Sequence, residues 1–280
     1  HERKNRLSHR KRCRKSSNLE DRSLHYFLVA LQFLTRIHII KQRNLRAADF
    51  GRSTRYFPLV GLVLGILYML ASWCLIAIFG WSNVVTTTLV ILPVLLTGAL
   101  HCDGFMDTMD GLFSGRERDR MLEIMKDSRV GSFGVVAFVM LMMINWSLLR
   151  DTPLLLIMTT LFVMPIVGRM AMVLAISFFS YAREEGMGKA FSDHANGKTV
   201  LIAAISTVLF VTPWGPAAIY ALFAGLSFAW FFSTYAARRL GGLTGDVYGA
   251  VEILTETVVL FVFFAAHWLP GGMLLLWKSW

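Results

Sequence analysis

Charged side chains are scarce in this sequence of 280 residues. They make up 16% of the chain, whereas a soluble globular domain carries about 25%. Hydrophobic residues reach 55% of the chain, and the mean hydropathy is +0.55. This balance excludes an ordinary soluble protein. Apolar runs of about 20 residues recur along the whole length, which is typical of a membrane protein.

Cysteine is scarce as well, with only Cys13, Cys74 and Cys102 in the chain. Their spacing matches no zinc-binding or redox motif, and it gives no reason to expect disulfide bonds. The length of the chain allows one domain, and nothing in the composition suggests a second. The sequence therefore predicts a fold that rests on apolar packing rather than on cross-links.

Basic charge is concentrated at the amino-terminal end, where residues 1–23 carry nine of the 28 Lys and Arg residues. Such a run is compatible with nucleic-acid binding. In so apolar a chain it is more typical of the cytoplasmic flank of a membrane protein. We therefore predict a disordered cytoplasmic tail over residues 1–23, one membrane-embedded catalytic domain over residues 24–280, and no nucleic-acid partner.

The hydropathy pattern predicts an all-α bundle of about seven transmembrane helices. The expected spans are 57–79, 80–100, 130–149, 152–179, 199–211, 217–237 and 257–277. Residues 24–40 are apolar on one side only, because they include Gln32, Thr35, Arg36 and His38. For this segment we predict an amphipathic interfacial or re-entrant helix rather than a span.

The distribution of charge predicts the orientation of these spans. Segments 1–56, 101–129, 180–198 and 238–256 hold 25 of the 28 Lys and Arg residues, and of the 18 acidic residues only Asp151 falls on the opposite face. Positively charged loops stay in the cytoplasm, so these four segments are expected to face it. A transporter more often buries its polar groups at mid-span. The layout therefore favours an enzyme with its site at the cytoplasmic interface.

The clearest chemical motif is HCDGFMDTMDG at residues 101–111. On a helix its Asp103, Asp107 and Asp110 point the same way. Their like charges repel, and a hard divalent cation such as Mg²⁺ removes that cost while it keeps water and phosphate ligands. A solvated loop with helix-capping aspartates is the alternative. His101 is a candidate general base or a residue that orients Asp103, although a lone His is more often structural.

A second charged block, RMLEIMKDSRVGSFG, occupies residues 120–134. Lys126 and Arg129 are candidates for binding phosphate, and Arg129 can do so with two parallel hydrogen bonds. Glu123 and Asp127 lie four residues apart, and we expect them to support the metal ligands. The alternative is an amphipathic surface helix with paired charges.

One arginine lies inside an apolar segment, at Arg169 of MPIVGRMAMV. A charge within the membrane is costly and is therefore a functional hypothesis by default. Pro165 is expected to kink the same helix and to open backbone groups nearby. We predict that Arg169 binds substrate phosphate. An arginine that extends to the membrane interface is the alternative.

The block YAREEGMGKAF, at residues 181–191, precedes a Gly-containing turn. Arg183 is a candidate for binding phosphate, and Tyr181 and Glu184 are expected to support the metal ligands. Alone the block is a weak signal, because a solvated helix end has the same composition.

The block GGLTGDVYGAVEILTE, at residues 241–256, is rich in glycine and contains three acids. Its backbone amides can approach phosphate closely. We predict Asp246 and Glu252 as further metal ligands and Glu256 as a supporting residue. Interfacial placement of the two glutamates, without a direct role, is the alternative.

These blocks together resemble the cobalamin synthase family, also called adenosylcobinamide-GDP ribazoletransferase. The resemblance runs from about Leu24 to the last span and is carried by HCDGFMDTMDG, RDRMLEIMKDSRVGSFG, PIVGR, YAREEGMG and GGLTGDVYGAVEILTE. It implies Mg²⁺-dependent joining of adenosylcobinamide-GDP to α-ribazole or its 5′-phosphate, with release of GMP. The product is adenosylcobalamin or its 5′-phosphate, and the setting is the bacterial inner membrane.

Three other functions share parts of the pattern. CDP-alcohol phosphotransferases use an aspartate motif that contains an Ala–Arg pair, which HCDGFMDTMDG lacks. Aromatic prenyltransferases usually show two aspartate-rich motifs with an Asn–Asp start, and neither is found. A divalent-cation transporter should place acids at mid-span, where this sequence has almost none. The sequence leaves open whether the chain acts as a homo-oligomer.

Overall fold

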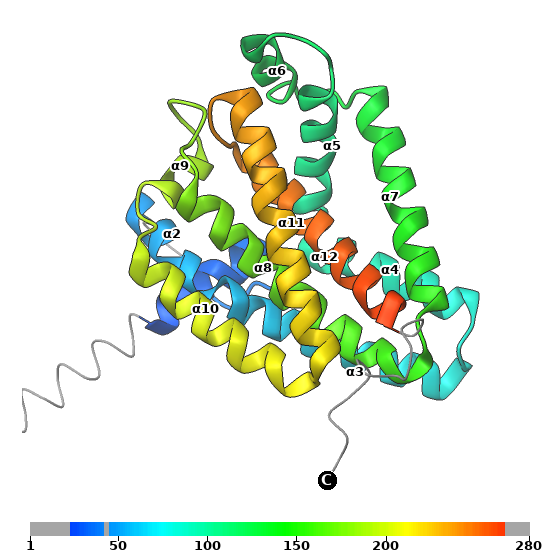
Figure 1. Cartoon of the computed structure of the whole chain (residues 1–280). Helices are drawn as coiled ribbons and strands as arrows, with labels where there is room; N and C mark the ends of the chain where they lie inside the picture. The colour runs from blue at the N-terminus through cyan, green and yellow to red at the C-terminus, as the bar shows by residue number, and fades with distance from the viewer. Residues whose placement is uncertain (1–22, 42–44, 267–280) are drawn as a thin grey trace, which may run out of the picture.

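The computed structural model describes residues 23–41 and 45–266 (Figure 1). Within these ranges the chain is helical, with no β-sheet. Six of the described helices are long and apolar enough to cross a membrane, or seven if one bent pair counts as a single span. The predicted polytopic helical bundle is therefore confirmed. Except for Ser23, the predicted basic tail lies outside the described residues, as does the last expected span beyond Ala266.

Short connections join successive helices. The first described helix is Ser23–Leu34. The elements that follow are α2 (Ala47–Ser53), a 3₁₀ turn at Thr54–Tyr56, α3 (Phe57–Phe79), α4 (Asn83–Thr97), α5 (Leu100–Leu112), α6 (Arg118–Ile124), α7 (Ser132–Asp151), α8 (Leu154–Phe178), α9 (Met187–Ser192), α10 (Gly197–Val211), a 3₁₀ turn at Thr212–Trp214, α11 (Pro216–Leu240) and α12 (Gly245–Ala266).

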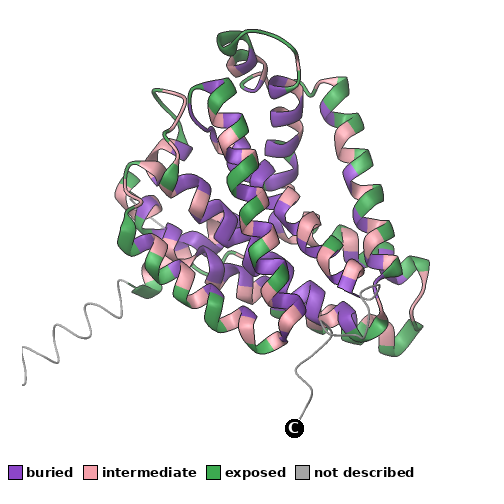
Figure 2. Cartoon of the chain, in the orientation of Figure 1, coloured by how far each residue is buried: buried purple, intermediate pink, exposed green. Residues whose placement is uncertain are grey.

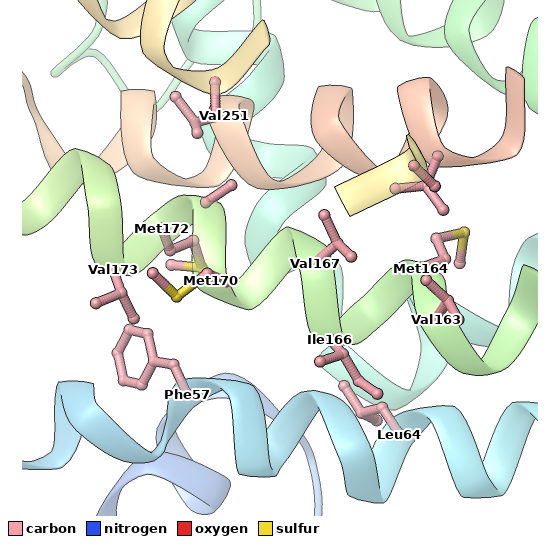
Figure 3. Packing of buried hydrophobic residues seen from close by; sticks show 14 of the residues in the cluster. Phe57, Leu64, Val163, Met164, Ile166, Val167, Met170, Met172, Val173 and Val251 are labelled. Atoms are coloured by element: carbon pink, nitrogen blue, oxygen red, sulfur yellow. The ribbon is translucent and has the colours of Figure 1, made fainter. Parts of the chain in front are cut away.

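Helix α8 forms the centre of the bundle, and Figure 2 shows it as the most continuously buried helix. Figure 3 shows α8 between α3, which carries Phe57 and Leu64, and α12, which carries Val251. On α3, Gly61 and Gly65 face α8 so closely that a Cβ atom at either position would overlap a backbone carbonyl oxygen. Small residues four positions apart allow this backbone-to-backbone packing in membrane bundles.

The expected span at residues 80–100 is shorter and bent. Helix α4 ends at Thr97, and α5 leaves it at an angle of 92°. At the bend, Gly98 and Ala99 have left-handed backbone angles, with φ of +65° and +61°. Such angles cannot continue a right-handed helix. The aspartate motif therefore begins a new helix of its own rather than following a straight span.

The last described helix, α12, begins earlier in the chain than the sequence predicts. The sequence placed residues 238–256 in a loop and the final span at 257–277, whereas α12 begins at Gly245. The acidic residues Glu252 and Glu256 suggested a segment outside the membrane. In the structure both are buried within the helix bundle beside Arg169. Because a cation lies against them, their charges do not exclude them from the bundle.

The connections between helices gather at two ends of the bundle. In Figure 1, α6, the α8–α9 connection and the α11–α12 connection lie at the upper end. Away from it, the α3–α4 turn packs against the end of α7, where the indole of Trp81 donates a hydrogen bond to the carbonyl oxygen of Arg150 at 3.4 Å. The motifs from separate parts of the sequence therefore meet at the upper end.

Candidate active site

A short backbone bridge joins two loops at the upper end. The N–H of Ala182 donates to the carbonyl oxygen of Leu243, and the N–H of Leu243 donates to that of Ser180, both at 2.8 Å. Gly242 permits this approach, because its φ is +149° and a Cβ atom there would lie 2.7 Å from the Ser180 oxygen. The bridge fixes the YAREEG loop beside the GGLTGD loop.

This bridge places Arg183 beside Asp246. The Arg183 guanidinium donates to Oδ2 of Asp246 at 3.0 Å, and the Thr244 hydroxyl donates to the same oxygen at 3.2 Å. The Thr244 oxygen also accepts from the N–H of Val247 at 3.3 Å, which caps the start of α12. About a fifth to a quarter of each charged side chain stays exposed, at 22% and 24%. The ion pair is therefore accessible to a ligand.

Helix α5 brings its aspartates to the same place. Gly104 packs against the backbone of Asp246, and a Cβ atom at Gly104 would lie 2.8 Å from the Asp246 carbonyl oxygen. Asp103 and Asp246 line one cavity of about 230 Å³. Asp107, one turn further along α5, lies within electrostatic range of Asp103, Asp110, Asp246 and Arg183. The first aspartate motif and the Gly-rich segment therefore meet, as the sequence predicted.

This outer cluster, defined as Asp103, Asp107, Asp246 and Arg183, has three carboxylates and one guanidinium. Within the described residues, no three His, Cys, Asp or Glu side chains enclose a metal ion by themselves. Mg²⁺ does not require such a cage, because it usually binds one or two carboxylates and completes its shell with water and substrate phosphate. The excess of carboxylate oxygens beside a cavity fits a Mg²⁺ ion that binds together with a phosphate substrate.

Asp110, predicted as a metal ligand, accepts hydrogen bonds from two backbone amides. Its Oδ2 accepts from the N–H of Gly131 and its Oδ1 from the N–H of Gly134, both at 2.8 Å. At Gly134 a Cβ atom would lie 2.5 Å from Oδ2, so the contact needs a glycine there. Both carboxylate oxygens are thus engaged, and Asp110 ties the start of α7 to α5.

The block around α6 carries exposed ion pairs. Arg120 pairs with Glu123 at 2.7 Å, and Arg129 pairs with Asp127 at 2.8 Å. Hydrogen bonds from Arg129 lower the pKa of the Asp127 carboxyl to about 2. The Arg129 side chain is 88% exposed. In the described part of the chain, neither Arg129 nor Lys126 forms an ion pair with an aspartate of α5. The structure therefore presents these cations to solvent rather than within the outer cluster.

Arg169 belongs to a second polar group, deep between α8 and α12. Its guanidinium forms ion pairs with Glu252 and Glu256. Gly168 leaves room for them, since a Cβ atom there would lie 2.9 Å from Cγ of Glu256. From α5, His101 brings Nδ1 to 3.9 Å from Oε2 of Glu252. Arg169, expected to bind phosphate, and Glu252, expected to bind metal, are therefore paired with each other in this inner cluster.

Tyr181 and Glu184 lie on the loop that carries Arg183. Tyr181 lines the cavity beside the outer cluster, and its ring packs so closely on Gly188 that a Cβ atom there would lie 2.5 Å from Cε2. Burial raises the pKa of the Tyr181 hydroxyl. Glu184 is exposed, and its carbonyl oxygen accepts from Nζ of Lys189 at 2.7 Å. Of the two predicted supporting residues, Tyr181 is the one at the cavity.

Sequence reasoning missed Arg118 of α6. Its Nε donates to the carbonyl oxygen of Leu240 at 2.8 Å, and its Nη2 donates to that of Ala182 at 3.3 Å. Arg118 therefore ties α6 to both bridged loops. The partner Leu240 lies 122 residues away in the chain, and a single sequence gives no sign of such a contact.

Comparison with known proteins identifies a family that shares this sequence. A family model described as Cobalamin-5-phosphate synthase matches residues 26–264. Curated relatives called adenosylcobinamide-GDP ribazoletransferase are 39% identical in Geotalea daltonii (86% of this chain, 98% of the relative), 37% in Desulfitobacterium hafniense (85% and 96%) and 33% in Clostridium acetobutylicum (87% and 97%). No solved structure matches the chain. The matched region contains both the outer and the inner cluster.

Proposed function

Because this chain belongs to the cobalamin-5-phosphate synthase family, we propose that its outer cluster is the active site of an adenosylcobinamide-GDP ribazoletransferase. The substrates are adenosylcobinamide-GDP and α-ribazole or its 5′-phosphate, and GMP is released. One observation carries the assignment: Asp103 and Asp246, from two distant motifs, line one cavity with Arg183, and Asp107 lies within electrostatic range of all three.

The reaction is a phosphoryl transfer. The oxygen of the ribazole 3′-hydroxyl attacks the phosphorus attached to the cobinamide arm. A new P–O bond forms, the bond from this phosphorus to the bridging oxygen breaks, and GMP leaves with that oxygen. The hydroxyl proton passes to His101, which lines the same cavity, or to a carboxylate that is not bound to metal. No oxidant or reductant is needed.

Mg²⁺ is part of this proposal, and Asp103, Asp107 and Asp246 would hold it. When bound, the ion supplies positive charge that neutralises the diphosphate during transfer. Arg183 adds a guanidinium at the same cavity and can bind a phosphate oxygen. Arg129, exposed on the segment before α7, is proposed to bind the diphosphate of the substrate from the solvent side. Positioning and charge neutralisation together account for most of the catalysis in this chemistry.

We further propose that the upper end of the bundle faces the cytoplasm of a bacterium, at the inner membrane. The loops at this end lie in the Lys- and Arg-rich segments of the chain, as expected for cytoplasmic loops. Both substrates are polar molecules that do not cross a bilayer readily. An opening on that side gives them access without crossing the lipid.

The direct test is release of GMP from adenosylcobinamide-GDP by the purified full chain in detergent, with α-ribazole and Mg²⁺ present. We expect GMP to form, to stop on addition of EDTA, and to resume with excess Mg²⁺. Absence of GMP formation by the wild-type protein would refute the proposed function.

Asp107→Asn tests the metal assignment within the same assay. It removes one negative charge with little change in shape, so turnover should fall by at least about 100-fold, as when other electrostatic groups are removed from active sites. The unfolding temperature should change by less than about 2 °C. Asp151→Asn is the matched control, because Asp151 is exposed at the end of α7, away from the cluster. Near-normal turnover of Asp107→Asn would contradict the assignment.

A further inference from the structure

The cavity beside the outer cluster has two kinds of lining. Its charged part consists of Asp103, Asp246 and Arg183, together with Gly245. Its apolar part includes Phe33, Phe57, Met172, Ile176 and Phe191, which come from four helices, and His101, Tyr181 and Tyr248 also line the cavity. A site of this composition suits a molecule with one flat apolar end and one end rich in oxygen.

Three aromatic rings form the wall of the apolar part. The ring centre of Phe191 lies 4.9 Å from that of Phe33 and 5.7 Å from that of Phe57, in tilted and edge-on arrangements. They come from α9, the first helix and α3, and tertiary packing brings them together. Phe191 follows Arg183 by eight residues, so neighbouring parts of the chain supply the aromatic wall and the guanidinium. The aromatic wall is therefore formed before a ligand binds.

We propose that this cavity binds the base of α-ribazole, a flat bicyclic dimethylbenzimidazole, and directs its ribose toward the aspartates. The inference rests on the proposed function and concerns which substrate fills which part of the site. In this orientation the 3′-hydroxyl lies beside the carboxylates that accept its proton. The phosphate of the partner substrate then approaches from the side of Asp107 and Arg129.

The size of the cavity excludes the corrinoid as its occupant. Pockets for drug-sized molecules run from about 300 to 1,000 Å³, and this one has about 230 Å³. A corrin macrocycle with its side chains is larger than a drug-sized molecule. The corrinoid must therefore lie outside the cavity, with only its phosphate close to the outer cluster.

The chemistry of the lining favours benzimidazole over the guanine of the GDP group. Guanine is also flat and bicyclic, but its edge carries N–H, amino and carbonyl groups that need hydrogen-bond partners. The Phe, Met and Ile side chains of the lining supply none, and apart from the charged residues only His101, Tyr181 and Tyr248 among its side chains can do so. Burial of those polar groups without partners costs free energy. Dimethylbenzimidazole exposes C–H and methyl groups along the corresponding edge and meets no such penalty.

Steady-state kinetics of Phe33→Ala tests the assignment, with the full chain in detergent and each substrate varied in turn. Loss of one aromatic wall should raise the KM for α-ribazole about tenfold, in the range for lost apolar contacts in a substrate pocket. The KM for adenosylcobinamide-GDP should stay within about twofold, because that substrate does not contact this wall. Phe231→Ala is the matched control, since Phe231 is 72% exposed on α11; it should change neither KM.

A second probe is the free base 5,6-dimethylbenzimidazole. In the wild-type protein it should inhibit competitively against α-ribazole and not against adenosylcobinamide-GDP. If Phe33→Ala fails to fold, Met187→Ala serves instead, because Met187 lines the same cavity and is 63% exposed. Inhibition by the base should then weaken by about threefold or more, consistent with loss of part of an apolar pocket.

Two results would overturn the inference. A raised KM for adenosylcobinamide-GDP with an unchanged KM for α-ribazole would assign the cavity to the other substrate. Equal changes in both values would indicate a purely structural role for Phe33. Either result leaves wild-type GMP release intact, so failure of this inference is distinguishable from failure of the proposed function.

Discussion

The outer and inner clusters contain the same chemical group in opposite surroundings. In the outer cluster, Asp103 is exposed and Asp246 keeps about a quarter of its side chain in solvent, at 24%. In the inner cluster, Glu252 is 1% exposed and Glu256 6% exposed, and both contact Arg169. One group of carboxylates can therefore exchange ligands with water, and the other cannot.

This difference explains why only one cluster is proposed to bind metal. A buried carboxylate without a partner is very costly, and direct contact with a guanidinium offsets that cost. The outer cluster has three carboxylates and a single guanidinium, so its remaining repulsion is relieved when a cation binds. Whether an acidic side chain serves the fold or binds a metal is therefore decided by its burial and by the cation that contacts it, and not by its residue type.

Replacement of Arg169, the cation of the inner cluster, is expected to have the largest effect, and this effect is on the stability of the protein. Arg169→Met leaves Glu252 and Glu256 unpaired inside the bundle, and breaking a buried pair in this way costs about 3–5 kcal/mol. We expect low yield of monodisperse protein and a clearly lower unfolding temperature, measured by size-exclusion chromatography and thermal unfolding in detergent.

The control for this change removes the acids as well. Arg169→Met combined with Glu252→Gln and Glu256→Gln leaves no unpaired charge among the three residues and should recover much of the lost unfolding temperature. If Arg169→Met alone were stable but raised the KM for adenosylcobinamide-GDP, the phosphate-binding role predicted from the sequence would be favoured instead.

A substitution that separates the two bridged loops should reduce turnover by an intermediate amount and disturb only the outer cluster. Gly242→Ala adds a Cβ atom at a φ of +149° and against the Ser180 oxygen, with a strain of about 1–3 kcal/mol. Displacement of Arg183 and Asp246 should lower turnover about tenfold, since small misplacements are costly in catalysis. Gly197→Ala, where an added Cβ atom meets nothing within 4 Å, should leave turnover unchanged. Equal turnover of the two variants would argue against the bridge as the positioning element.

The smallest effect is expected from the exposed cation on the segment before α7. Arg129→Gln should raise the KM for adenosylcobinamide-GDP by about three- to tenfold, because an exposed charge contributes little until a phosphate binds it. Arg120→Gln removes a similar exposed arginine, which pairs with Glu123, and should have no such effect. Identical KM values for the two variants would remove Arg129 from the proposed site.

Local patterns were enough to predict most of the bundle. Apolar length predicted α3, α7, α8 and α11 to within a few residues, because membrane helices must be long and apolar. The bend at Gly98 was missed, since the left-handed angle of Ala99 beside it is not typical of alanine. The start of α12 was missed because compensation of its acids depends on a distant residue.

The site follows the same division. The helical spacing of Asp103 and Asp107 was visible in the sequence, and the structure brings them to Asp246 as expected. The pairing of Arg169 with Glu256 spans 87 residues, and the backbone contacts of Asp110 depend on glycines 21 and 24 residues away. Contacts of this kind are decided by tertiary packing. A single sequence therefore does not reveal whether a charged residue binds a ligand or pairs with another residue of the same chain.

Binding of Mn²⁺, a paramagnetic substitute for Mg²⁺, tests the division between the clusters most directly. Electron paramagnetic resonance can measure bound Mn²⁺ in the wild-type protein, in Asp107→Asn and in Glu256→Gln. We predict that Asp107→Asn weakens Mn²⁺ binding by at least about tenfold, as expected for lost metal-site contacts, while Glu256→Gln binds as the wild type does. Retention of Mn²⁺ by Asp107→Asn, with its loss from Glu256→Gln, would contradict the account.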